Sequence, residues 1–273
     1  MAAGFEVSGT VAVDGIDVHV EGEGAETIVM VHGWPDTYRL WDAQVAFLRE
    51  RYRCVRFTLP GFDIAKARRA YSIDEMAEFL RHVIEQVSPG RKVTLLLHDW
   101  GCLFGYQFYA RYPNLVERII GVDIGDTRKL KESLSARGKF YITAYQWWLA
   151  LAWLIGGRLG DRMALKMKRW LRSPSDERFI GSCMSYPYYL TWFGGAQSYR
   201  PQFRRFIPAC PMLFVYAKRK PVMFHTEAWL EELQKRKENR VVAFDTGHWI
   251  MLQQPERFNQ AVSSWLSATA TVS

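Results

Sequence analysis

An aspartate stands where a strand is expected to turn into a helix, in the segment His98-Asp99-Trp100-Gly101. The preceding run, 93–97, is apolar and begins with two β-branched residues, which is typical of a buried strand. The following run, 102–110, predicts a helix that ends before Pro113. A strand, a tight turn and a helix expose the side chain at the turn as a nucleophile. Because that side chain is the carboxylate of Asp99, we expect displacement at carbon, whereas a serine there would predict acyl transfer.

A carboxylate nucleophile of this kind needs a base to activate water, and His248 is the candidate. It lies in Thr246-Gly247-His248-Trp249, which follows the last predicted strand and precedes the final helix. In chains that present the nucleophile on a strand–turn–helix unit, the catalytic residues follow in the order nucleophile, acid, histidine. We therefore expect the base in this last loop.

The loop His32-Gly33-Trp34-Pro35 follows the third predicted strand. In folds with a strand–turn–helix nucleophile, the loop at that position supplies one of the two backbone amides of an oxyanion hole. We therefore expect the backbone amides of Trp34 and Trp100 to face the charge that develops on Asp99 during ester hydrolysis. The aromatic residues around these groups are expected to contact the substrate: His32, Trp34, Trp100 and Trp249.

Together these segments resemble the Asp-nucleophile branch of the α/β-hydrolase superfamily, which contains epoxide hydrolases and haloalkane dehalogenases. The resemblance covers nearly the whole chain and is strongest at 32–35, 98–101 and 246–249. It implies that Asp99 forms an alkyl-enzyme ester and that water activated by His248 hydrolyses this ester. It implies a small hydrophobic substrate and no metal or organic cofactor.

The leaving group separates the two families. In epoxide hydrolases two cap tyrosines stabilise the alkoxide, and Tyr145 resembles the first of them. The second normally lies in a motif for which 191–194 is the nearest match, with Phe193 at the tyrosine position. Tyr189 is therefore the candidate, with Tyr188 and Tyr186 as alternatives if the helix register differs.

Three functions follow, and epoxide hydrolysis is the first because epoxide hydrolases usually carry an aromatic residue at the position of Trp34. A haloalkane dehalogenase with the same nucleophile and base is the second, since the indole N–H of Trp34 could serve a halide. An idle relative that binds a hydrophobic ligand or a lipid surface is the third. The segment Asp99-Trp100-Gly101 occurs in both enzyme families and does not separate them.

The acid that orients the histidine departs from the usual pattern. Lys220 occupies the position at which the family often places an acidic residue, and a lysine cannot orient a histidine that must become protonated. Many dehalogenases place the acid after the preceding strand, where this chain has Asp123. We therefore predict Asp123 as the third catalytic residue, although Asp123 could instead cap the chain's exit into a lid. Asp245 is a weaker candidate, because it is expected to lie on a strand.

Strand-like and helix-like segments alternate on either side of these residues, which predicts an α/β-hydrolase fold with a mostly parallel, doubly wound sheet. Strands are expected at 5–13, 16–20, 27–31, 54–58, 93–97, 119–123, 211–216 and 241–245. Helices are expected at 40–51, 72–87, 102–110, 224–236 and 255–266. The alternation stops between 126 and 208, so we divide the chain into a core of 1–125 and 209–273 and a helical cap of 126–208.

The composition limits partners and location. The chain has 273 residues and a formal net charge of +8, but its basic segments contain no nucleic-acid motif, so we expect no nucleic-acid partner. The scattered cysteines and the absence of a signal-like N-terminus predict a cytoplasmic protein, as monomer or homodimer. The segment 141–157 carries no charge and is short for a membrane span. We expect it to form a buried helix of the cap or a face for peripheral contact with lipid.

Overall fold

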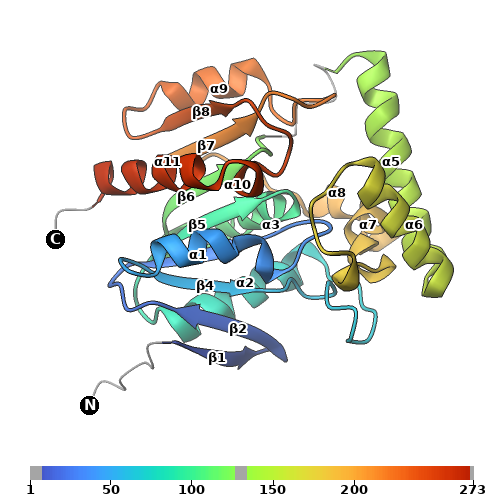
Figure 1. Ribbon diagram of the computed structural model, residues 1–273, viewed down its shortest axis with the longest axis horizontal. Helices are drawn as coiled ribbons and strands as arrows, with labels where there is room; N and C mark the ends of the chain where they lie inside the picture. Colours follow the sequence, from blue (N-terminus) through green and yellow to red (C-terminus); the bar gives the residue numbers. More distant parts are fainter. Residues whose placement is uncertain (1–7, 127–133, 271–273) are drawn as a thin grey trace.

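The computed structural model describes residues 8–126 and 134–270, and within these ranges eight strands form one sheet (Figure 1). The strands are β1 (Ser8–Val13), β2 (Ile16–Glu21), β3 (Thr27–Val31), β4 (Arg53–Phe57), β5 (Val93–His98), β6 (Val116–Val122), β7 (Met212–Ala217) and β8 (Arg240–Phe244). Their order across the sheet is β1-β2-β4-β3-β5-β6-β7-β8. Antiparallel pairing joins β1 to β2 and β2 to β4, and all later pairs are parallel. The predicted fold class is confirmed.

Helices cover both faces of the sheet, which explains why its central strands are apolar throughout. Successive side chains of β3 point to opposite faces. Ile28 and Met30 pack in the layer that contains α1 (Asp42–Leu48), α10 (Ile250–Gln253) and α11 (Pro255–Ala268). Val29 and Val31 pack in the layer that contains α2 (Ile73–Val87), α3 (Trp100–Tyr109) and α9 (Glu227–Gln234). All five residues of β3 are buried.

The start of α2 shows how closely local sequence sets an element. The Ser72 hydroxyl accepts a hydrogen bond from the Glu75 amide over 3.1 Å, and the Glu75 carboxylate accepts one from the Ser72 amide over 2.8 Å. This reciprocal capping box satisfies two amides that have no partner inside the helix. The predicted helix at 72–87 is confirmed with its first helical residue at Ile73.

Within the described residues, the α-helices between β6 and β7 are α5 (Ala136–Ile155), α6 (Gly157–Trp170), α7 (Tyr186–Phe193) and α8 (Tyr199–Gln202). In Figure 1 they stand at the right of the sheet, beyond the carboxyl ends of its parallel strands. In doubly wound folds ligands bind outside those strand ends. The cap boundaries 126 and 208 stay a prediction, because 127–133 lie outside the described residues.

The uncharged segment 141–157 falls mainly in α5. Across the described parts of the chain, no helix combines the length and the apolar character needed to cross a membrane.

Candidate active site

Asp99 occupies the turn between β5 and α3 with φ 53° and ψ −122°, a backbone conformation that residues other than glycine rarely adopt. Such a conformation costs about 1–3 kcal/mol and persists only where the surroundings hold it in place. A Cβ atom at Gly33 would lie 2.4 Å from Asp99 Oδ1, and one at Gly101 would lie 2.2 Å from the Val31 carbonyl oxygen. The turn and the loop after β3 can therefore meet only because both positions are glycine.

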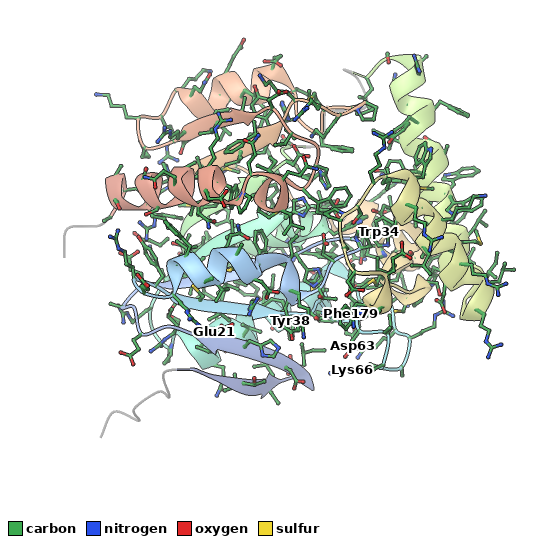
Figure 2. All side chains as sticks on the ribbon, viewed as in Figure 1. Glu21, Trp34, Tyr38, Asp63, Lys66 and Phe179 are labelled. Atoms are coloured by element: carbon green, nitrogen blue, oxygen red, sulfur yellow. The ribbon has the colours of Figure 1, made fainter. Side chains whose placement is uncertain are left out.

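Backbone amides contact this carboxylate. The Trp34 amide donates a hydrogen bond to Asp99 Oδ1 over 2.7 Å, and the Trp100 amide also bonds to the carboxylate. Figure 2 shows Trp34 where the core meets the cap. These are the two amides predicted to form an oxyanion hole, and Oδ2 faces His248.

His32 has a different position from the one predicted. Its ring is fully buried, Nδ1 donates to the Gly33 carbonyl over 2.9 Å, and Nε2 accepts from the Leu59 amide over 2.9 Å. It lines neither cavity that contains Asp99. The expected contact of His32 with substrate is therefore wrong, since both ring nitrogens are used to fix the loop that carries Trp34.

His248 lies between two carboxylates. Its Nε2 atom is 3.5 Å from Asp99 Oδ2, and its Nδ1 atom is 2.5 Å from Asp123 Oδ2. Asp123 follows β6 directly and is completely buried, with φ 70°. The structure thus brings together the three residues that the sequence analysis chose as nucleophile, base and acid.

Lys220 contacts the carboxylate of Asp123. Its ammonium lies 2.6 Å from Asp123 Oδ1, and the Ala217 amide donates to the same oxygen over 2.8 Å. The side chain of Lys220 is 5% exposed. Each oxygen of Asp123 therefore has its own partners, with Oδ2 bonded to His248 and Oδ1 to Lys220 and Ala217.

These contacts set the charges of the site. Burial alone would lower the pKa of His248, but its contacts with Asp123 and Asp99 outweigh burial and raise the pKa to about 9. Burial would raise the pKa of Asp99, yet His248 keeps it below the ordinary value. Asp123 likewise has a lowered pKa, since the charge of Lys220 and the bond to His248 exceed the effect of burial. At neutral pH the site therefore holds two carboxylates and one imidazolium.

Two cavities, of about 820 Å³ and about 500 Å³, share Asp99, Tyr145, Tyr188 and Phe224 as lining residues. Both tyrosines are buried, and their rings lie 6.1 Å apart. Trp100 lines the larger cavity, whereas the smaller one is lined by Trp34 and by two residues of the final loop, His248 and Trp249.

Tyr189, the predicted second cap tyrosine, is placed elsewhere. It lines neither cavity, and its ring contacts Trp153. Tyr188 lines both cavities instead, with its ring 5.2 Å from that of Trp100 and 6.1 Å from that of Trp34. One residue along a helix rotates a side chain by about 100°, so the prediction failed by one position in α7.

Comparison with known proteins agrees with this geometry. Residues 28–261 match the alpha/beta hydrolase family. The chain belongs to the alpha/beta hydrolase family. The solved structure of a Bacillus megaterium epoxide hydrolase with an inhibitor superposes on this alpha/beta hydrolase with a TM-score of 0.69 and 19% identity. The superposition covers 95% of this chain and 100% of that one.

Curated relatives of this alpha/beta hydrolase match over shorter stretches. "Probable oxidoreductase EphD" of Mycobacterium tuberculosis is 38% identical over 112 residues, which are 39% of this chain and 19% of that protein. Epoxide hydrolase 1 of Caenorhabditis elegans is 32% identical over 100 residues, 36% of this chain and 24% of that protein. The matches thus span about a fifth to a quarter of these relatives.

A second buried group, Asp36 with His98, lies beside the predicted nucleophile, base and acid of this alpha/beta hydrolase and was not predicted from the sequence. Asp36 is 3% exposed and accepts hydrogen bonds from Trp249 Nε1, over 3.1 Å, and from the Ser175 hydroxyl. Burial raises the pKa of Asp36 to about 6. His98 Nδ1 lies 3.9 Å from Asp36 Oδ2, and the His98 ring contacts that of His248 in a tilted arrangement with centroids 4.4 Å apart. An acid directly after Pro35 is the only local signal that could have pointed to this group.

Metal ligands were not predicted in this alpha/beta hydrolase. Among residues 8–126 and 134–270, no three His, Cys, Asp or Glu side chains come together in a way that could hold a metal ion.

Proposed function

We propose that the protein hydrolyses epoxides to vicinal diols through an alkyl-enzyme ester on Asp99. The observation that carries the proposal is the placement of Tyr145 and Tyr188 in both cavities that Asp99 lines. Hydroxyl groups beside a carboxylate nucleophile suit a leaving alkoxide, which needs a proton. The likeness to proteins named epoxide hydrolases supports the same reaction.

In the first step Asp99 Oδ2 attacks one carbon of the oxirane ring, and the bond from that carbon to the ring oxygen breaks. The lowered pKa of Asp99 keeps its carboxylate ionised at neutral pH. Its Oδ1 atom stays bonded to the Trp34 amide, which fixes the direction from which Oδ2 approaches the substrate.

The ring oxygen leaves as an alkoxide, and the two tyrosines stabilise it. Burial raises the pKa of Tyr145 and of Tyr188, so both keep their protons at neutral pH. The Tyr145 hydroxyl oxygen accepts a hydrogen bond from Gln146 Nε2 over 3.3 Å, which leaves its own proton free for the substrate. One tyrosine then gives its proton to the alkoxide.

Ester formation prepares His248 for the second step. Once Asp99 is esterified, its negative charge is gone, and one of the two carboxylates that raise the pKa of His248 no longer acts. His248 then releases its proton to solvent. The tyrosine that gave its proton to the alkoxide takes a proton back from solvent. The neutral imidazole can now accept a proton from water.

That water attacks the carboxyl carbon of the ester, and negative charge develops on Oδ1, where the Trp34 and Trp100 amides stabilise it. Collapse of this intermediate breaks the bond between the carboxyl carbon and Oδ2 and releases the diol, which takes its proton from His248. Collapse leaves Asp99 as the carboxylic acid, and its proton passes to His248, which restores the carboxylate and the imidazolium of the resting site. The sum is one epoxide plus one water giving one diol.

A haloalkane dehalogenase is the second candidate, favoured by one observation. The Nε1 atom of Trp34 is buried and has no hydrogen-bond partner within the described residues, and Trp34 lines the smaller cavity together with Asp99. A free N–H at that place suits a departing halide. A protein that binds without catalysis is disfavoured by the contact between His248 and Asp99, since such a protein would not need it.

The test measures diol and halide release by the purified protein on a panel of alkyl and aryl epoxides and haloalkanes. We expect diol from epoxides, complete loss of activity in Asp99→Asn, and a covalent adduct in the intact mass of His248→Gln. In a single turnover in ¹⁸O-water the diol should carry no label, because its new oxygen comes from Asp99.

Asp245→Asn is the matched control, because this carboxylate is exposed, pairs with Arg219 and is not among the residues that line either cavity. Halide release without diol would transfer the assignment to dehalogenation. Turnover that persists in Asp99→Asn would contradict the covalent route.

A further inference from the structure

The helix α5 is apolar on the side that faces solvent. Phe140, Trp147, Leu151 and Leu154 recur every three to seven residues, so that they lie on one side of the helix. Their exposed fractions are 75%, 45%, 43% and 51%. Exposed apolar surface of this extent normally marks a site of interaction.

This outer face cannot be buried by turning the helix. Tyr145, Leu149 and Ala152 lie on the opposite side of α5 and are buried, and Tyr145 lines the cavities at Asp99. The helix is therefore anchored by its inner face. In Figure 1 it runs along the outer edge of the cap, away from the sheet.

The apolar surface continues onto α7. The ring of Trp147 lies 5.8 Å from that of Trp192 and 5.7 Å from that of Phe193, which is 40% exposed. We use the term cap face for these neighbouring apolar residues of α5 and α7: Phe140, Trp147, Leu151, Leu154, Trp192 and Phe193.

Positive charge is concentrated in the same part of the chain. Residues 134–208 contain twelve Arg and Lys against three Asp and Glu, an excess of nine, while the whole chain has a net charge of +8. Arg137 and Lys139 lie in the first turn of α5, Arg158 follows its last turn, and all three are exposed. The cap face is thus bordered by cations at both ends of its helix.

We propose that the cap face binds the surface of an anionic lipid bilayer, with α5 lying in the plane of the interface. An apolar helix face with Trp and Phe, flanked by Arg and Lys, is the composition that such surfaces attract. A second copy of this chain fits less well, because two cap faces in contact would bring two strongly basic surfaces together.

The cap face also adjoins the larger cavity. Trp192, which contacts Trp147, and Lys139, at the start of α5, both line the cavity that contains Asp99. This part of the inference rests on the proposed function: an apolar epoxide dissolved in the bilayer would enter beside α5 and reach Asp99 without crossing water.

The experiment is flotation of the purified full chain with vesicles of phosphatidylcholine alone or mixed with phosphatidylglycerol. We expect binding to the anionic vesicles. This binding should weaken as salt is raised, because the Debye length shortens as ionic strength increases. Leu151→Glu combined with Leu154→Glu should lower the bound fraction about tenfold or more, since it puts two charges on the face that enters the interface.

Phe47→Glu is the matched control, because Phe47 is 45% exposed on α1, away from the cap. It should leave binding unchanged. Circular dichroism and turnover of a water-soluble epoxide establish that each variant is folded, and the flotation result does not depend on turnover. Vesicle binding without any turnover would therefore contradict the proposed function but leave this inference standing.

The inference is overturned if the wild-type chain does not float with anionic vesicles at low salt, or if the double variant floats as well as Phe47→Glu. It is also overturned if the double variant only converts a dimer to a monomer in gel filtration, which would assign the cap face to a second copy.

Discussion

At the scale of single residues, the pairing of Lys220 with Asp123 changes what each charge does. Lys220 occupies the position at which related proteins often have the acid of the triad. If the acid were required at that position, the triad would be incomplete. Instead the ammonium lies 2.6 Å from Asp123 Oδ1 and leaves Oδ2 to His248. Lys220 thereby offsets part of the negative charge that holds the proton on His248, and we expect this to matter most in the proposed ester intermediate.

We predict that Lys220→Met raises the pKa of His248 in the ester intermediate, because Asp123 then acts on it without compensation. Ester hydrolysis needs neutral His248, so the rising limb of kcat against pH should move upward by about one unit. At pH 7 kcat should fall about tenfold and recover at higher pH.

A pH profile of kcat for wild type, Lys220→Met and Lys220→Arg measures this shift. The arginine variant keeps the charge and should keep the wild-type profile. If Lys220 acted only on packing, Lys220→Met would lower kcat equally at every pH, and the predicted role would be refuted. Breaking this buried pair should also lower the unfolding free energy by about 3 kcal/mol.

The two tyrosines give a second prediction at this scale. Tyr188→Phe and Tyr145→Phe should each slow alkylation of Asp99 by an epoxide about 10²-fold or more, because a proton donor to the alkoxide is lost. Tyr189→Phe is the control, since Tyr189 contacts Trp153 and lines neither cavity. Stopped-flow measurement of ester formation tests this, and equal rates for Tyr188→Phe and Tyr189→Phe would exclude Tyr188 as a donor.

At the scale of elements, the strained turn after β5 depends on the loop after β3. A Cβ at Gly33 would meet Asp99 Oδ1, Asp99 Cβ and the Trp100 amide at 2.4–2.5 Å, and two of these three atoms cannot move without the backbone. The approach of two segments that are distant in sequence therefore decides whether the Trp34 amide reaches the Asp99 carboxylate.

We predict that Gly33→Ala displaces the loop, lowers kcat about 10²-fold or more and lowers the unfolding free energy by about 1–3 kcal/mol. Gly138→Ala is the control, because a Cβ there meets nothing closer than 3.4 Å and a helical alanine is favourable. Denaturant unfolding and steady-state kinetics on both variants measure the changes in unfolding free energy and in kcat. Full activity in Gly33→Ala would show that the contact is not limiting.

Elements and site residues were predictable from sequence to different degrees. The strand at 27–31 was predicted with the bounds it has, because its apolar run is complete and polar residues flank it. Asp99 and His248 were predictable as site candidates because each follows a strand in a short local motif, and the structure brings their side chains together. Tyr188 was not chosen over Tyr189, because the choice depends on how α7 turns toward the core. Asp36 was missed because its partners Ser175 and Trp249 lie more than 130 residues away.

At the scale of the whole molecule, the basic excess and much of the exposed apolar surface lie together in residues 134–208. The sequence shows both the basic excess of 134–208 and the uncharged run 141–157. It does not show that Tyr145 lies on the inner side of α5 while Trp147 lies on the outer side, since that depends on the packing of the cap. Family membership and the α/β-hydrolase fold are confirmed, whereas the cytoplasmic location stays a prediction.

The meeting of two unequal cavities at Asp99 has a stereochemical consequence. Under the proposed function, an oxirane held with one substituent in the space of about 820 Å³ and the other in the space of about 500 Å³ would present one of its two carbons to Oδ2. The two carbons of a meso epoxide, equivalent in solution, become distinguishable on the protein. Attack with inversion at the same carbon in every turnover would convert an achiral compound into a single enantiomer of the diol.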